Sequence, residues 1–119
     1  MGGKAFEIKT GDRLLLAVTK LKGRGQISLD GQVLFQGVDL ESAEEMAARI
    51  LPEGDHVVDL TASDFRGNRY DMRITVKVQK DGQPESLLTI MHIISSGKPN
   101  DTSGGETLRF MAVRRENDE

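Results

Sequence analysis

The chain has 119 residues, no cysteine and a formal net charge of −3. This length suits one domain with a core of its own, which we expect over residues 1–114, followed by a charged, frayed tail at residues 115–119. Without cysteine there are no disulfides, thiolate metal sites or thiol nucleophiles. The acidic balance makes a nucleic-acid partner unlikely, and four Phe, one Tyr and no Trp offer little for base or sugar stacking.

The N-terminal residues lack the apolar segment of a secretion signal, and no stretch approaches the roughly 18 apolar residues that a membrane span requires. We therefore expect a soluble protein with no membrane span and no secretion signal. A cytoplasmic protein or a component of a virion or similar assembly is favoured, although the compartment is otherwise unknown.

In chain order, the first elements are short runs in which apolar and polar residues alternate, a pattern typical of strands. Strands are predicted at Lys4–Lys9 and Leu14–Leu21, and a flexible turn at residues 22–25. Strands at Gln26–Leu29 and Gln32–Gln36 then flank Asp30-Gly31, a strong signal for a two-residue hairpin.

One segment departs from the strand pattern. Between Ser42 and Leu51, apolar residues recur at the three- and four-residue spacing of one helix face. Ser42 and Glu45 match a capping box, and Pro52 and Gly54 follow as stop signals. The sequence predicts one short helix at about residues 42–51.

The clearest alternation predicts a long hairpin from Asp55 to Val78 that turns at residues 64–68. The side chains predicted to face the core are His56, Val58, Leu60 and Ala62 on the first arm, and Tyr70, Met72, Ile74, Val76 and Val78 on the second. A slip of one residue would expose the whole apolar set, so the register should be firmly fixed.

An extra C-terminal hairpin is predicted at Ser86–Arg114, with strands Ser86–Ser95 and Thr107–Arg114 joined by a polar, mobile loop. Together these elements predict a mainly β fold, an antiparallel β-sandwich with one short helix.

The stretch from Gly54 to Asn68, with its "A-S-D-F-R-G-N" turn, and the closing Val76-Lys77-Val78 resemble the last hairpin of bacterial immunoglobulin-like modules of the polycystic-kidney-disease and hyalin-repeat types. Leu29-Asp30-Gly31 is similar to their mid-domain hairpin. The resemblance covers about residues 25–79. It implies an immunoglobulin-like sandwich without enzymatic activity, used in adhesion, assembly or carbohydrate contact.

No arrangement of residues matches a known catalytic, metal or cofactor motif, so none of these sites is predicted and the protein is not expected to be an enzyme. His56 and His92 are interpreted as half-buried histidines satisfied by a neighbouring backbone or carboxylate group. The alternative is a general base that acts with a partner carboxylate such as Asp59 or Asp71. A calcium site among the Asp residues is disfavoured because no calcium-loop spacing is present.

The predicted strand at residues 87–94 is apolar on both faces, more than a one-sided sheet buries. If the predicted helix covers one face, the strand belongs to the core. Otherwise Leu87, Met91 and Ile93 mark a surface for self-association or docking.

Two further candidates are polar. Lys20, Lys22 and Arg24 form a basic turn, interpreted either as a solvated β-turn or as a site for a phosphate or an acidic partner. Tyr70 and Phe65 are the candidate aromatic residues for contact with carbohydrate.

Three functions remain open. The favoured hypothesis is a non-enzymatic interaction or assembly module that docks onto itself or onto a larger complex, such as a phage or secretion assembly. The second is a carbohydrate-binding accessory domain. The third is a small ligand-binding protein or enzyme that uses His56 or His92.

Overall fold

A computed structural model describes residues 5–40, 44–63, 70–80, 86–95 and 103–114. The described residues form eight strands and contain no helix. In chain order the strands are β1 (Ala5–Lys9), β2 (Arg13–Leu29), β3 (Gln32–Leu40), β4 (Glu44–Ile50), β5 (Gly54–Ser63), β6 (Asp71–Gln79), β7 (Ser86–Ser95) and β8 (Ser103–Val113). The prediction of a mainly β protein is confirmed.

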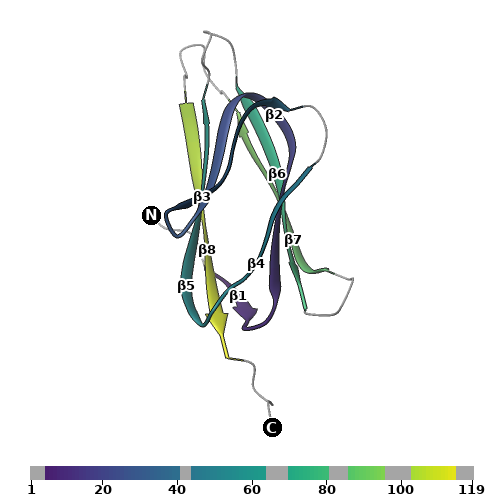
Figure 1. Ribbon diagram of the computed structural model, residues 1–119, viewed down its shortest axis with the longest axis vertical. Coiled ribbons are helices and arrows are strands. Elements are labelled where there is room, and N and C mark those ends of the chain that lie inside the picture. Colours follow the sequence, from purple (N-terminus) through teal and green to yellow (C-terminus); the bar gives the residue numbers. More distant parts are fainter. Residues whose placement is uncertain (1–4, 41–43, 64–69, 81–85, 96–102, 115–119) are drawn as a thin grey trace.

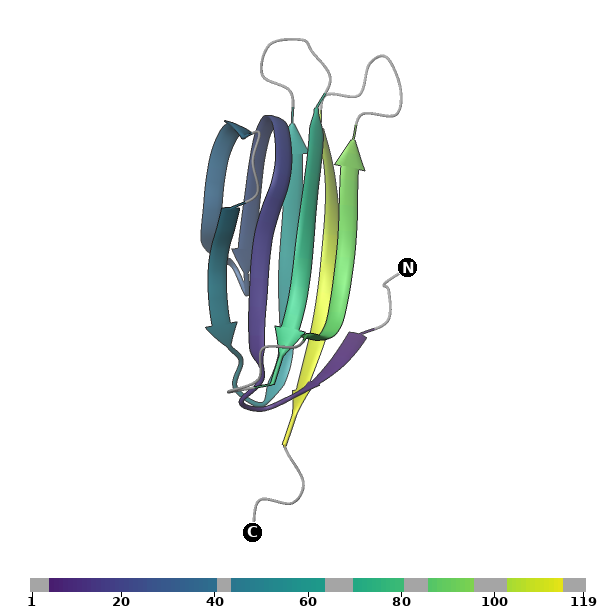
Figure 2. The ribbon, with the colours of Figure 1, turned by 90° about the vertical axis from the view of Figure 1, so that its right-hand side faces the viewer.

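All eight strands belong to one sheet, with the order β1-β8-β5-β2-β6-β7 and with β3 and β4 both paired to β2. The sheet curls into a half-barrel, as Figures 1 and 2 show. We call β1, β8, β5, β3 and the C-terminal part of β2 the β5 wing. The β6 wing consists of β4, β6, β7 and the N-terminal part of β2.

The sheet is mixed, because β1 runs parallel to β8 while the other pairs are antiparallel. The prediction of a wholly antiparallel structure is therefore wrong in this pair. A sandwich of two separate sheets is not confirmed either, since the hydrogen-bonded ladder continues through β2 from one wing to the other.

Strand β2 joins the wings because it bends in the middle. Its residues 13–22 pair with β6, and its residues 24–29 pair with β5. At the bend the register with β3 shifts between Leu21 and Arg24, and Gly23 takes a φ of +92°, which L side chains rarely adopt. The Gly23 N–H donates a 2.8 Å hydrogen bond to Asp39 Oδ1. The predicted flexible turn at residues 22–25 is thus wrong: glycine lets one strand bend.

The hairpin at Asp30-Gly31 is confirmed. Asp30 has a φ of 50° and Gly31 a φ of 87°, the positive pair that a type I′ turn requires. Leu29 pairs with Gln32 directly across the turn.

The core lies between the inner faces of the two wings. Every side chain predicted to face inward on β5 and on the second arm is buried: His56, Val58, Leu60, Ala62, Tyr70, Met72, Ile74, Val76 and Val78. Strand β2 adds Leu14, Leu16, Val18, Leu21 and Ile27 to the same core. Near the parallel strand pair, the Phe6 and Phe110 rings pack with centroids 5.6 Å apart. The period-two alternation therefore predicted the buried face correctly.

The predicted hairpin at Asp55–Val78 is wrong in its pairing. Strand β5 lies between β2 and β8, whereas β6 lies between β2 and β7. The two arms thus follow one another along the same edge of β2 and belong to different wings. Alternation specifies which face of a strand is buried, but it carries no information about which strand lies beside it.

The predicted helix at residues 42–51 is also wrong, because Glu44–Ile50 form strand β4. This strand pairs with β2 from Arg13↔Ile50 to Val18↔Glu44. A helix of ten residues is marginal without tertiary support. As a strand, the segment instead forms backbone hydrogen bonds with this edge of β2, which gives partners to the N–H and C=O groups there.

The extra C-terminal hairpin at Ser86–Arg114 is wrong as well, since β7 pairs with β6 while β8 pairs with β5 and β1. The single-domain boundary at residue 114 stays a prediction. The predicted turn at residues 64–68, the frayed tail at 115–119 and most of the mobile loop before residue 103 lie outside the described residues.

Candidate interaction surface

The outer face of β7 is apolar and open to solvent. Met91 is 78% exposed and Ile93 is 57% exposed, among the large apolar side chains that reach the surface. Across the β6–β7 pair, Met91 lies opposite Thr75 and Ile93 lies opposite Arg73. No described helix covers this face, and these two side chains are not part of the core. The side chain of Leu87 lies outside the described part of the structure.

Strand β7 is also an edge strand, since within the described sheet it pairs with β6 alone. Its ten residues, SLLTIMHIIS, include no Asp, Glu, Lys, Arg, Pro or Gly. From Leu88 to Ser95 its pairing with β6 has no register shift. A long, regular and uncharged edge strand presents unpaired backbone groups to any further strand.

The other edge strands differ from β7 in ways that hinder edge-to-edge pairing. Strand β1 has only five residues, of which Glu7 and Lys9 form a 3.3 Å ion pair. Register shifts interrupt the pairing of β3, and Asp39 bends it with a φ of 50°. Strand β4 contains three charged residues among seven. Short length, charge and irregularity are common protections of sheet edges.

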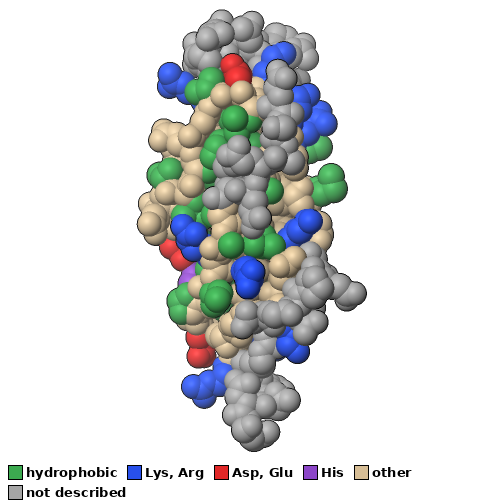
Figure 3. All heavy atoms as spheres, turned by 45° about the vertical axis from the view of Figure 1, so that its right-hand side comes forward, with side chains coloured by type: hydrophobic (Ala, Val, Ile, Leu, Met, Phe, Trp, Pro, Cys, Tyr) green, Lys and Arg blue, Asp and Glu red, His purple; other side chains and the backbone are tan. Residues whose placement is uncertain are grey.

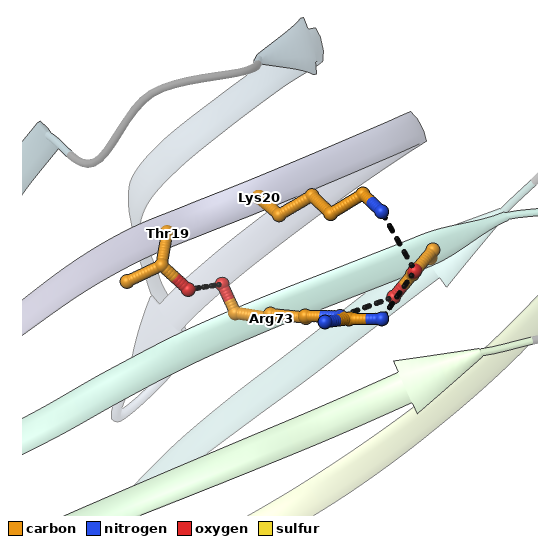
Figure 4. Close-up of polar contacts among 4 residues, drawn as sticks. Thr19, Lys20 and Arg73 are labelled. Carbon is orange, nitrogen blue, oxygen red and sulfur yellow. Dashed lines mark hydrogen bonds and ion pairs between the residues drawn. The ribbon is translucent and has the colours of Figure 1, made fainter.

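Beside β7, a polar network lies on β2 and β6 (Figure 4). Asp71 accepts from Arg73 at 3.2 Å and pairs with Lys20 at 3.5 Å. Thr19 Oγ1 donates a 3.1 Å hydrogen bond to the Arg73 carbonyl. Asp71 and Arg73 were not expected beside Lys20, because their proximity depends on the β2–β6 register, which the sequence does not encode in any local pattern.

The predicted basic turn does not exist as a unit. In the strand register, Lys20 lies opposite Arg73 and Lys22 lies opposite Asp71, both in the β6 wing. Arg24 lies beyond the bend, opposite Ser63 on β5 and Val38 on β3. The structure therefore assigns Lys20 to the network beside β7 and Arg24 to the outer face of the β5 wing.

Tyr70 is only 3% exposed and packs in the core. A β-carbon added to Gly104 would lie 2.8 Å from the Tyr70 hydroxyl oxygen, which places the phenol against β8. Tyr70 therefore offers no face for a sugar, and its prediction as an exposed contact is wrong. Phe65 lies outside the described residues.

His56 links the hairpin tip to the start of β5. Its Nδ1 lies 2.7 Å from Asp30 Oδ2, and its Nε2 lies 2.7 Å from the Pro52 carbonyl. Asp30 Oδ1 also accepts from the Val57 N–H at 2.8 Å. Because both partners of the ring are acceptors, the geometry favours the doubly protonated imidazolium.

The electrostatics of this pair agree with its geometry. Burial opposes the charge on His56, but the hydrogen bonds to Asp30 and Pro52 and the nearby carboxylates outweigh it and raise the pKa of His56. Burial likewise opposes the Asp30 charge, yet the bonds from His56 and Val57 lower the pKa of Asp30 overall.

With both ring nitrogens occupied, His56 is poorly suited to act as a base. The interpretation of His56 as a histidine satisfied by backbone and carboxylate groups is confirmed, and the side chain is buried rather than half-buried. The side chain of His92 lies outside the described residues.

In the described part of the chain, no group of three or more His, Cys, Asp or Glu side chains is arranged to hold a metal ion. No helix there is long and apolar enough to cross a membrane.

Figure 3 shows apolar side chains at the surface, with Lys and Arg side chains between them.

Comparison with known proteins does not place the chain in a family: no family model, curated protein or solved structure matches it.

Proposed function

We propose that this protein is a non-enzymatic interaction module that associates with a second copy of itself through the free edge and outer face of β7. The observation that carries the proposal is the combination, on one edge strand, of exposed Met91 and Ile93 with the absence of any charged residue. Monomeric proteins seldom leave such a strand unprotected.

Two β7 strands related by a two-fold axis would pair antiparallel and extend the β6 wing into a continuous sheet across both copies. A ten-residue strand is roughly 33 Å long, enough for a ladder of several backbone hydrogen bonds. Met91 and Ile93 of each copy would then lie close to the seam, where their apolar surface is removed from water.

The network of Lys20, Asp71 and Arg73 borders this apolar centre, because Arg73 lies directly opposite Ile93 in the β6–β7 register. An apolar centre with a polar rim is the usual anatomy of a protein interface. Since the network contains charges of both signs, it favours a partner with a similar mixture, and a second copy of the chain provides one.

The test is sedimentation velocity over a range of concentrations for the wild type, Met91→Lys and Ile93→Lys. We expect the wild type to form a dimer as concentration rises, and each lysine variant to shift the equilibrium strongly toward monomer, because a charge at the seam resists desolvation. Val33→Lys is the matched control, since Val33 is 48% exposed on the irregular edge strand β3.

A wild-type protein that stays monomeric at high concentration would refute self-association. Equal effects of Val33→Lys and Met91→Lys would refute the assignment to β7.

The immunoglobulin-like resemblance over about residues 25–79 adds no support, because the hairpin on which it was based is not formed by β5 and β6. The proposal therefore depends on β7, and pairing through β7 would also serve to anchor the protein in a larger structure, such as a phage particle or a secretion complex. The enzymatic alternative through His56 has less support, because Asp30 and Pro52 occupy both ring nitrogens.

A further inference from the structure

Met91 is the most exposed of the methionines whose side chains the structure describes. It is 78% exposed, whereas Met111 on β8 is 37% exposed and Met72 in the core is 1% exposed. An oxidant dissolved in water reacts only with a sulfur atom that it can reach. We therefore expect these three thioethers to be oxidised in the order of their exposure, with Met91 first.

Oxidation of Met91 would change the chemistry of the proposed seam between two copies. Met91 lies in the middle of β7, on the same face as Ile93. If two β7 strands pair antiparallel along their length, the two-fold axis passes near this middle, and both copies of Met91 lie close to it. Each oxidised side chain would then place a polar sulfoxide group in an apolar contact. A polar group buried without a hydrogen-bond partner is costly.

The single chain tolerates the same change much better. Because Met91 is open to solvent in one copy, water can donate hydrogen bonds to the sulfoxide oxygen. The Thr75 side chain also lies directly opposite Met91 in the β6–β7 register and carries a hydroxyl donor. Oxidation thus penalises the pair of copies and leaves the separate copy almost unaffected, which shifts the equilibrium toward monomer.

We propose that Met91 is a redox-sensitive modification site, at which oxidation by hydrogen peroxide to the sulfoxide disrupts self-association and reduction restores it. The inference rests on the proposed function, since it concerns the regulation of the same β7 surface.

The chemistry at Met91 is a two-electron oxidation. The sulfur lone pair forms an S–O bond with one oxygen of hydrogen peroxide, the O–O bond breaks, and the second oxygen leaves as water. In the reverse direction, a methionine sulfoxide reductase supplied with a dithiol restores the thioether. The sulfoxide oxygen then leaves as water, and the dithiol becomes a disulfide.

The first measurement locates the modification. Dilute protein is treated with hydrogen peroxide, and peptide mass spectrometry follows the addition of one oxygen atom to each methionine over time. Met91 should be oxidised several-fold faster than Met111, and Met72 should be the slowest of the three. If Met111 is oxidised as fast as Met91, the assignment of the site to Met91 is overturned.

The second measurement is the dimer Kd by sedimentation velocity, before and after peroxide treatment, with far-UV circular dichroism to check that the oxidised protein stays folded. For the wild type we expect the Kd to rise about ten-fold or more. Treatment of the oxidised protein with methionine sulfoxide reductases and a dithiol should return the Kd to its starting value.

Three variants assign the effect to one sulfur atom. The quantity compared is the ratio of the Kd after peroxide to the Kd before it, within each variant, so a changed starting affinity does not matter. Met91→Leu has no sulfur at this position, and its ratio should be close to one. Met111→Leu is the matched control on the outer face of β8, and it should keep the full rise. Met91→Gln, which is polar and uncharged, should weaken association without any peroxide.

The outcomes separate this inference from the proposed function. A reduced wild type that does not associate refutes both. A wild type that associates, but keeps its Kd once Met91 is oxidised, overturns the redox site alone. An equal rise in Met91→Leu also overturns it, because the responsible group would then lie elsewhere in the chain.

Discussion

Gly23, at the bend of β2, is the position where one added methyl group should damage the fold most selectively. Its φ of +92° already disfavours any L side chain, at a cost of about 1–2 kcal/mol. In addition, a β-carbon at Gly23 would lie 2.5 Å from the Ser63 carbonyl oxygen, closer than real atoms approach. Because that oxygen belongs to the backbone of β5, relief requires the strands to move apart.

Gly31 provides the matched control for the Gly23→Ala variant. Its φ of +87° is nearly the same, but an added β-carbon there meets no atom within 4 Å. Gly31→Ala should therefore cost only the conformational strain of about 1–2 kcal/mol. Gly23→Ala should cost a further 1–3 kcal/mol or so, the usual range for overpacking a filled site.

Urea denaturation followed by far-UV circular dichroism measures both variants, with the change in stability taken from the midpoint at constant slope. The reasoning predicts a clearly lower midpoint for Gly23→Ala than for Gly31→Ala. If the two variants lose the same stability, or if Gly31→Ala loses more, then the close approach of β2 and β5 at the bend is refuted.

Four other predictions follow from the described contacts. Because the pKa of His56 is raised, its pairing with Asp30 stabilises the fold fully below about pH 6.5 and is lost as the pH rises through the higher folded-state value. Asp30→Asn should thus lower the free energy of unfolding more at about pH 5.5 than at about pH 9, and an equal loss would contradict the ion pair. Asp39→Ala removes the acceptor of the Gly23 N–H and should destabilise by about 1–2 kcal/mol in urea, whereas Asp39→Asn, which keeps an oxygen acceptor, should lose much less. Phe110→Ala should cost about 3–5 kcal/mol in the same assay because its ring is buried against Phe6, and Met111→Ala, on the exposed face of β8, should cost far less. Lys20→Ala should change thermal stability by less than about 1 kcal/mol, since the Lys20 side chain is half exposed and Asp71 keeps its ion pair with Arg73, and a larger loss would show that the network holds the wing together.

The sequence predicted the strands and their faces better than it predicted their neighbours. Alternation in Val58, Leu60 and Ala62 identified the buried face of β5, because one side of a strand must face the core. The same pattern occurs in β6, and two adjacent alternating runs resemble a hairpin. Their placement in separate wings depends on long-range pairing with β2, which short-range patterns do not contain.

Turn chemistry was informative only where a turn exists. Asp30-Gly31 predicted its hairpin correctly, since both residues adopt the positive φ values that few others tolerate. Gly23 also has a positive φ, but there it serves a bulge inside a continuous strand. The apolar residues before Pro52 have helical spacing, but the segment forms strand β4 because it pairs with an edge of β2.

The surface side chains show the same contrast between local sequence patterns, which were predicted, and strand neighbours, which were not. The apolar side chains of β7 were identified from the sequence, since a doubly apolar strand is unusual in a one-sided sheet. The polar row of Gln36, Gln26 and Thr61 on the β5 wing was not predicted, because these residues come from three strands and become neighbours only through the registers of β2 with β3 and β5.

The most direct test of the proposed association is amide hydrogen exchange of β7 in dilute and in concentrated protein. The account predicts that protection of β7 amides increases with concentration, as the free edge gains backbone partners, while protection on the irregular edge strand β3 stays unchanged. Unchanged exchange in β7, or increased protection in β3 alone, would contradict association through the edge of β7.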